Sequence, residues 1–203
     1  DSHLAAMAAC VERGLPFFVE KPPCAIAQLP QYESIVEQAQ GRGLKCAAGF
    51  CYRYHPALDR RAIWQAERWM KIVGEDNLLK RYGPTVAETM ASHAVDLALF
   101  SFGPVSRVNL LVSADGTRLE GITSHRRGIA EYDQRMDGPT RKAFITAGRA
   151  HTATVQLPTN DEMYVAELRQ WLGWLAGGSI GKLATLADGL AVMEVLAQCK
   201  SVS

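Results

Sequence analysis

The first quarter of the chain alternates between helical and buried-strand patterns. Residues 5–12 form an alanine-rich stretch that predicts a helix ending at Gly14, and residues 15–19 form an apolar, aromatic-rich run typical of a buried strand. Residues 31–40 place apolar side chains on one helical face, and residues 44–52 form a second buried run. Helix, strand, helix and strand with short connections predict parallel strands joined by right-handed crossovers.

After Pro56 the pattern changes to consecutive short strands. Helices are expected at residues 57–68, 92–101, 161–176 and 185–199. Strands are expected at residues 69–73, 78–82, 105–113, 117–125, 127–134, 141–147 and 150–157, with a hairpin turn at 74–77. Strands that follow one another without helices indicate an antiparallel sheet. We therefore expect half of a parallel α/β domain in residues 1–55 and an α+β domain with an antiparallel sheet in residues 56–203.

Composition excludes several classes of protein. The chain has 203 residues and a net charge of +1, so no strong field would attract nucleic acid or an anionic membrane. No apolar run approaches the roughly 20 residues of a membrane span. Five cysteines without a Cys-x-x-Cys pair favour reduced thiols in a cytoplasmic protein. The chain opens on Asp1 rather than on Met or a signal peptide, so we expect it to be cut, engineered or partly recorded.

Lys21 is the first candidate for chemistry. It follows a predicted parallel strand at the end where open α/β sheets bind their ligands. Its amine could donate a hydrogen bond to a substrate hydroxyl and stabilise a developing alkoxide. Two consecutive prolines, Pro22 and Pro23, take the chain out of the sheet and allow a cis peptide here. A surface lysine that caps a loop is the alternative, and position alone favours it.

His93 is the second candidate, at the start of a predicted helix. Imidazole suits a general base near pH 7, and Asp96 lies three residues later on the same helical face, where it could orient the ring. A partly buried histidine at a helix cap is the alternative. His3 starts the first helix and could contact a ligand there. The remaining histidines are spaced too irregularly for a metal site, so no bound metal is expected.

Four stretches, in this order, carry a resemblance to a known family. They are SH followed by GLPFFVEKP (residues 2–3 and 14–22), GFCYRYHP (49–56), SHAVD followed by FGPVSRV (92–96 and 102–108), and MYVAELR with DGL (163–169 and 188–190). Together they resemble the glucose–fructose oxidoreductase, inositol dehydrogenase and rhizopine-catabolism family, abbreviated Gfo/Idh/MocA. The similarity extends over nearly the whole chain.

The resemblance implies a Rossmann-type parallel sheet followed by an open antiparallel-sheet domain, and an oxidoreductase that uses NAD or NADP. The substrate would be a sugar, a cyclitol or a sugar nucleotide. The implied catalytic residues are Lys21 and His93. The cofactor would contact His3, Glu20, Lys21, Pro22 and Arg53. The substrate would contact Tyr164, and Asp96 would have either a structural or a substrate-binding role. The broad face of the open sheet also predicts a homo-oligomer.

Two departures from the family pattern leave a second function open. The sequence holds no Gly-x-Gly-x-x-Gly segment, which binds the pyrophosphate of the dinucleotide at a helix N-terminus. Thr89 stands where the family usually has an aspartate four residues before the histidine, either because the acid is lost or because nearby residues are missing. The alternative is therefore a non-catalytic, sugar-binding or oligomer-forming module of the same fold. The sequence does not distinguish NAD from NADP.

Overall fold

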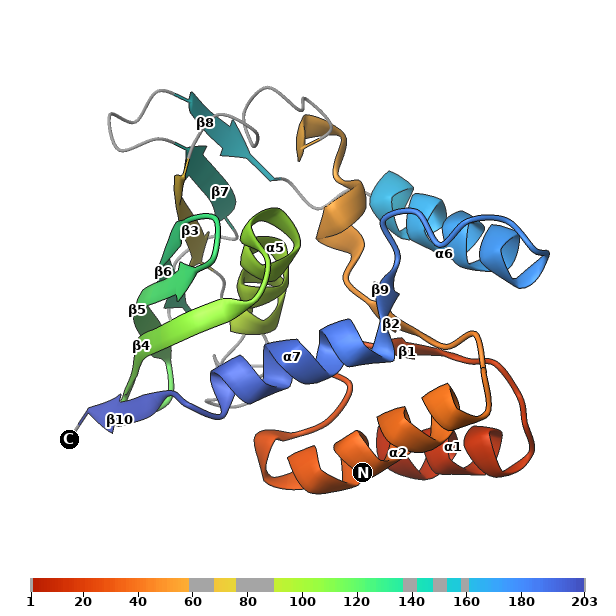
Figure 1. Ribbon diagram of the computed structural model, residues 1–203. Helices are drawn as coiled ribbons and strands as arrows, with labels where there is room; N and C mark the ends of the chain where they lie inside the picture. Colours follow the sequence, from red (N-terminus) through yellow and green to blue (C-terminus); the bar gives the residue numbers. More distant parts are fainter. Residues whose placement is uncertain are drawn as a thin grey trace.

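The computed structural model describes residues 2–58, 68–75, 90–136, 142–147, 153–157 and 161–202. In these ranges the chain forms two sheets with helices packed around them (Figure 1). The small sheet has the strand order β1-β2-β9 and the large sheet has the order β10-β4-β5-β6-β3-β7-β8. None of the helices in the described ranges has the length and apolar character that a membrane span requires.

The small sheet contains the predicted parallel pair. Its strands are β1 (Phe18–Glu20), β2 (Ala47–Gly49) and β9 (Ala184–Thr185). Helix α1 (Ser2–Glu12) precedes β1, and helix α2 (Leu29–Gly41) connects β1 to β2. β1 and β2 run parallel, which confirms the alternating helix and strand pattern, and β9 adds an antiparallel strand that the sequence did not predict. The observed strands β1 and β2 are both shorter than the apolar runs that predicted them. Residues after β2 turn into a short 3-10 segment, η2 (Cys51–Tyr54).

Helix α2 packs as its periodicity predicts. Its buried side chains are Tyr32, Ile35, Val36 and Ala39. The hydroxyl of Tyr32 donates a 3.0 Å hydrogen bond to the carbonyl of Leu186, the first residue of α7 (Leu186–Leu196). This bond joins segments 154 residues apart and places the start of α7 beside the small sheet. The predicted division of the chain at residue 55 remains a prediction.

The large sheet is mostly antiparallel, as expected. Its strands are β3 (Trp69–Glu75), β4 (Val105–Ser113), β5 (Arg118–His125), β6 (Ile129–Arg135), β7 (Lys142–Ala147), β8 (Ala153–Gln156) and β10 (Lys200–Val202). Two pairings are parallel, β3 with β6 and β10 with β4, and neither was predicted. The other described pairings in this sheet are antiparallel.

The hairpin turn predicted at 74–77 is wrong over its first two residues. Gly74 and Glu75 continue β3 and pair with both β6 and β7. A Cβ at Gly74 would require the side-chain amide of Gln134 to shift, so the two strands approach closely at this point. Residues 76–77 and the strand predicted at 78–82 lie outside the described residues. Most of the helix predicted at 57–68, namely residues 59–67, also lies outside them. The described residues at the start of that range belong to a 3-10 turn, η3 (Pro56–Leu58).

Helix α5 (Ser92–Phe102) covers one face of the large sheet and also packs against α7. Beneath its C-terminal end, the ring of His125 bonds the carbonyl of Gly103 and the hydroxyl of Thr123, each at 2.7 Å. Tyr132 extends this chain of bonds, with 2.8 Å between its hydroxyl and that of Thr123. Burial lowers the pKa of His125. The network therefore holds a neutral histidine inside the fold.

Candidate active site

The segment η2 is the centre around which the candidate residues gather. It follows β2 at the carboxyl end of the parallel pair and packs against both α5 and α6 (Asp161–Leu175). In Figure 1 it lies between these two helices and above the small sheet. The edge of a parallel sheet at which its strands end is the usual ligand position in such folds. The sequence predicts Lys21 at this edge, and the structure places it there.

The Glu20-Lys21-Pro22 stretch leaves the sheet where β1 ends. The Lys21–Pro22 peptide is cis, as the two prolines allowed. Glu20 is exposed, whereas Lys21 is half-buried. The imidazole Nδ1 of His3 lies 3.2 Å from the carbonyl oxygen of Pro22 and so brings the start of α1 to the same place. The structure thus brings together the four N-terminal residues that were predicted to face a cofactor.

Lys21 also lies close to η2. Burial raises the pKa of the Cys51 thiol to about 12, with further effects from the charges of Glu167, Glu20 and Lys21. Glu20 pairs with Gly49 in the parallel sheet, so the residues that follow β1 and the start of η2 lie side by side. A thiol with this pKa stays protonated and unreactive near neutral pH. Cys51 is therefore a packing residue, in keeping with the cysteines expected to be reduced.

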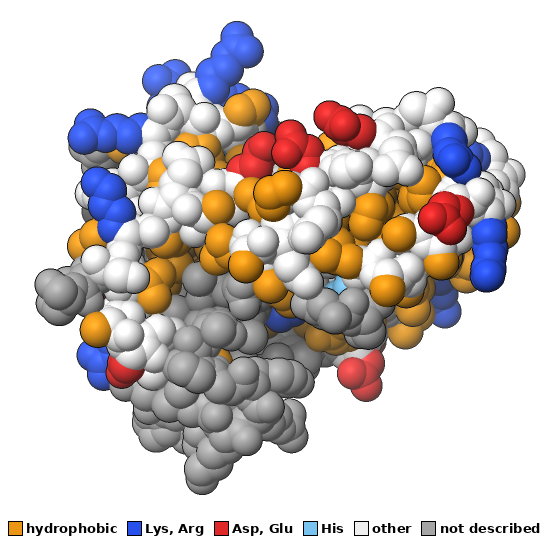
Figure 2. Space-filling model, turned by 90° about the horizontal axis from the view of Figure 1, so that it is seen from below, with side chains coloured by type: hydrophobic (Ala, Val, Ile, Leu, Met, Phe, Trp, Pro, Cys, Tyr) orange, Lys and Arg blue, Asp and Glu red, His pale blue; other side chains and the backbone are white. Residues whose placement is uncertain are grey.

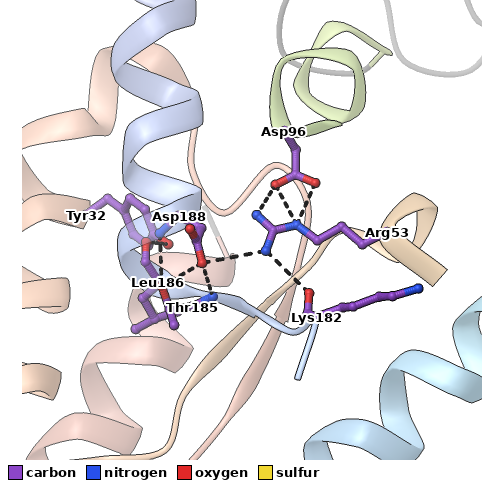
Figure 3. A network of polar contacts seen from close by, with 7 residues as sticks. All are labelled: Tyr32, Arg53, Asp96, Lys182, Thr185, Leu186 and Asp188. Atoms are coloured by element: carbon purple, nitrogen blue, oxygen red, sulfur yellow. Dashed lines mark hydrogen bonds and ion pairs between the residues drawn. The ribbon is translucent and has the colours of Figure 1, made fainter. Parts of the chain in front are cut away.

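Arg53 and Asp96 form a buried ion pair that joins η2 to α5 (Figure 3). The Nε of Arg53 lies 3.1 and 2.9 Å from the two carboxyl oxygens of Asp96, and its Nη2 lies 2.5 Å from Oδ1. Its Nη1 reaches the Lys182 carbonyl at 3.4 Å and the Asp188 carboxylate at 3.7 Å. The guanidinium also lies 4.8 Å from the centre of the Phe100 ring. Four segments therefore meet at one arginine.

This ion pair bears on two of the predicted roles. Burial raises the pKa of Asp96 to about 6, and the charge of Arg53 opposes the shift, so the carboxyl is an anion at pH 7. Both carboxyl oxygens of Asp96 bond the guanidinium, which favours the structural alternative over direct substrate contact. Contact of Arg53 with a cofactor remains a prediction.

His93 occupies the second position of α5 and faces η2. Its ring meets the ring of Tyr52 edge-on, with 4.7 Å between centroids, and the ring of Phe50 at 6.2 Å. Lys21 and His93 thus approach the same short segment from β1 and from α5. Thr89, where the family usually has an aspartate, lies outside the described residues.

Helix α6 contributes Tyr164 and one residue that the sequence argument missed. Tyr164 is half-buried and hydrogen-bonds the Cys51 thiol. Glu167, three residues later, is 1% exposed, and its carboxyl interacts with the backbone amide of Phe50. The available signal was the spacing, since residues at i and i+3 share a helical face. A glutamate one turn after a predicted site tyrosine was therefore a candidate for the same site.

The other histidines take structural positions or lie outside the described residues. His55 is buried, and its Nδ1 accepts a 3.2 Å hydrogen bond from the backbone amide of Ala57. His125 belongs to the network under α5, and His151 is outside the described ranges. Among the described residues, no group of three or more His, Cys, Asp or Glu side chains could hold a metal ion.

Known structures share the fold of this chain. No protein-family model and no curated protein sequence matches the chain. The UDP-N-acetylglucosamine 3-dehydrogenase GnnA from Acidithiobacillus ferrooxidans superposes with a TM-score of 0.82 and 17% identity, over 98% of this chain and 74% of that one. GenD2 from gentamicin A biosynthesis, solved with NAD, gives a TM-score of 0.76 and 18% identity over 96% and 71% of the two chains.

A third neighbour was solved with both a cofactor and a sugar nucleotide. The WlbA dehydrogenase from Thermus thermophilus, in complex with NAD and UDP-GlcNAcA, has a TM-score of 0.74 and 16% identity, over 99% of this chain and 71% of that one. At such identities the likeness establishes the fold. It confirms the predicted combination of a Rossmann-type parallel segment and a mostly antiparallel sheet.

Proposed function

We propose, from a fold shared with the Gfo/Idh/MocA-type dehydrogenases, that this protein is an NAD(P)-dependent oxidoreductase acting on a hydroxyl or keto carbon of a sugar, cyclitol or sugar nucleotide. The observation that carries the proposal is the approach of Lys21 and His93 to η2 at the carboxyl end of the parallel strands. A cationic amine and an imidazole are the groups needed to polarise a hydroxyl and to move its proton.

The residues around β1 suit the nicotinamide end of a dinucleotide. Glu20 is exposed, Lys21 is half-buried, and the ring of His3 lies within hydrogen-bond distance of the backbone at Pro22. These residues form a polar surface at the edge of the sheet. When bound, the cofactor supplies the hydride acceptor or donor. Lys21 would donate a hydrogen bond to the reacting oxygen, and His93 would accept the hydroxyl proton during oxidation and return it during reduction. Arg53 would support the same edge from η2.

The neighbours indicate which substrate class to test first. GnnA is a UDP-N-acetylglucosamine dehydrogenase, and WlbA was solved with UDP-GlcNAcA, so a sugar nucleotide is the first substrate class to test. Tyr164 would contact the substrate from α6, since it lies near Cys51 and Glu20. Both NAD and NADP should be assayed.

A non-catalytic sugar-binding or oligomer-forming module is the second candidate. One sequence observation favours it: Thr89 stands where the family usually has an aspartate. Calorimetry with a sugar nucleotide and with NAD(H) distinguishes the two functions. Binding of the sugar nucleotide without binding of the dinucleotide would support the module and contradict the enzyme.

The test of the enzymatic roles is a hydride-transfer assay of the full-length protein. We expect Lys21→Ala and His93→Ala each to lower kcat by about 10²–10⁴-fold, because each removes a group that moves or stabilises a proton. Lys200→Ala is the matched control, since Lys200 is exposed on β10 of the large sheet, and it should leave kcat unchanged. If both site variants turn over at the normal rate, the assignment of roles fails.

A further inference from the structure

Helix α6 buries a carboxyl group while it leaves large apolar side chains exposed. Val165 and Leu168 are each 43% exposed and Leu172 is 58% exposed, whereas Glu167 is 1% exposed. Helices normally bury their apolar side chains and leave glutamate in water, because burial of an ionisable group costs free energy. Of the α6 side chains, only those of Met163 and Glu167 are buried. The burial of Glu167 therefore calls for a specific role.

Glu167 meets the segment that carries the candidate site. The backbone amide of Phe50 interacts with its carboxyl, and this amide also lies 3.1 Å from the carbonyl oxygen of Ala48. The second carboxyl oxygen, Oε1, has no hydrogen-bond partner within the described part of the chain. One turn earlier, Tyr164 hydrogen-bonds Cys51, so α6 holds both ends of the turn between β2 and η2.

Several charged or titratable groups surround the carboxyl. Glu20 faces it from β1 and Asp96 from α5, while Arg53 is the cation that acts on it from η2. Cys51 and Tyr54 also lie within range of its charge, and their pKa values are raised mainly by burial. The described surroundings of Glu167 thus contain two carboxylates and one guanidinium, and that guanidinium is engaged by Asp96.

We propose that Glu167 is a positioning residue that holds residues 50–54 onto α6, and thereby fixes Arg53 and the aromatic rings against which His93 lies. The proposal deepens the proposed function, because it concerns the same site. The link from α6 to Phe50 and Cys51 is itself independent of any reaction. Glu167 acts through η2 and does not contact the reacting atoms.

The pH dependence follows from the same burial. Burial raises the pKa of Glu167 to about 8, from an ordinary value of 4.5, and the charges of Glu20 and Asp96 act in the same direction. A carboxyl whose pKa is higher in the folded state stabilises that state most below its unfolded pKa. This stabilisation declines as pH rises from about 4.5 and is lost once pH passes 8. The hydrogen bond from the Phe50 amide favours the carboxylate, but burial has the larger effect, so ionisation of Glu167 should on balance loosen the segment.

Hydrogen exchange of the Phe50 amide tests the proposal without any assay of turnover. Protection factors, which are corrected for the intrinsic exchange rate, would be measured by NMR between pH 6 and 9 on the full-length protein. We expect the wild-type factor to fall by up to about tenfold per pH unit between pH 6 and 8 and to level off above pH 8, since the closed and open states differ in proton binding only between the unfolded and folded pKa values. E167Q keeps a neutral acceptor, so its protection should stay constant over this range.

Glu162→Gln is the matched control, because Glu162 is exposed on the same helix and should show the wild-type dependence. An identical pH dependence in wild type and E167Q would overturn the proposal. If E167Q does not fold, the wild-type titration decides alone, and constant protection through pH 8 overturns it. The protein could also lose protection in a way that depends on Glu167 and yet transfer no hydride. That result would support the positioning role and refute the proposed function.

Discussion

At the scale of single residues, the Arg53–Asp96 pair is the strongest polar interaction described between η2 and α5. The two side chains are 4% and 1% exposed, so each charge depends on the other for its solvation. A buried pair contributes little compared with apolar packing, but removal of one partner leaves an unbalanced charge in the interior. The pair therefore makes the junction specific: η2 can lie against α5 only where the guanidinium meets the carboxylate.

Asp96→Asn should lower the free energy of unfolding by about 3–5 kcal/mol, because it leaves the buried Arg53 guanidinium with only the more distant carboxylate of Asp188, 3.7 Å away. Urea denaturation at pH 7 measures the loss. Arg53→Met should cost a similar amount, and the double variant should cost much less than the sum, since neither charge then remains. Additive losses would show that the two side chains do not depend on each other.

At the scale of elements, the sequence predicted the long regular segments and missed the short ones. Residues 105–113 form the predicted strand, and the buried face of α2 has the predicted residues. The strands Ala184–Thr185 and Lys200–Val202 escaped prediction because two or three residues show no alternation, and only their partners define them. The apolar run 44–52 predicts one strand, but its last residues turn into η2.

The candidate site was predicted in part for the same reason. Lys21 and His93 were recognisable from their motifs, and the structure brings both to η2. Glu167 was missed because a glutamate in an amphipathic helix is ordinarily a solvent-facing residue. Its spacing from Tyr164 places it on the same helical face, but its burial depends on how α6 packs against η2, which the sequence of the helix does not specify.

The packing of α7 against the small sheet gives a prediction at the same scale. A Cβ at Gly189 would lie 2.8 Å from the hydroxyl of Tyr32 and 3.3 Å from the Cβ of Ala48. Gly189→Ala should therefore push α7 away from α2 and disturb the bond from Tyr32 to Leu186. We expect a loss of about 1–3 kcal/mol in the free energy of unfolding, measured by thermal or urea denaturation.

Gly173→Ala is the control for that change. Gly173 also lies within a helix, but no atom would meet a new Cβ within 4 Å. Alanine there should stabilise the protein by about 0.5–1 kcal/mol, because glycine loses more backbone entropy in a helix. Equal effects at the two glycines would contradict the packing argument.

At the scale of the whole molecule, the C-terminal part of the described chain packs against the small sheet formed by the N-terminal part. β9 pairs with β2, and α7 then leads from the small sheet to β10 at the edge of the large one. Seen from below, the surface shows small groups of hydrophobic side chains among polar ones, with most Lys and Arg side chains near the margins (Figure 2). Patches of this kind do not by themselves identify an interface, so the large sheet has to be tested directly.

The outer face of the large sheet is the surface predicted to form a homo-oligomer. Along β5 the odd-numbered residues 119, 123 and 125 are buried beneath the helices, while Ile122 is 41% exposed on the opposite face. Beside Ile122 lie Asn109 of β4 and Glu131 of β6, and Glu131 forms a 2.7 Å ion pair with Lys71. An exposed isoleucine within a ring of polar side chains suits the centre of an isologous contact.

Ile122→Lys should therefore convert the protein to a monomer, because a twofold contact would place two introduced ammonium groups close together in an apolar centre. Size-exclusion chromatography with light scattering gives the mass of each species. Leu15→Lys is the control: Leu15 is 48% exposed but lies between α1 and β1, away from the large sheet, so its substitution should leave the mass unchanged. A wild-type protein that is already monomeric, or an Ile122→Lys variant that keeps the wild-type mass, would exclude this face as the interface.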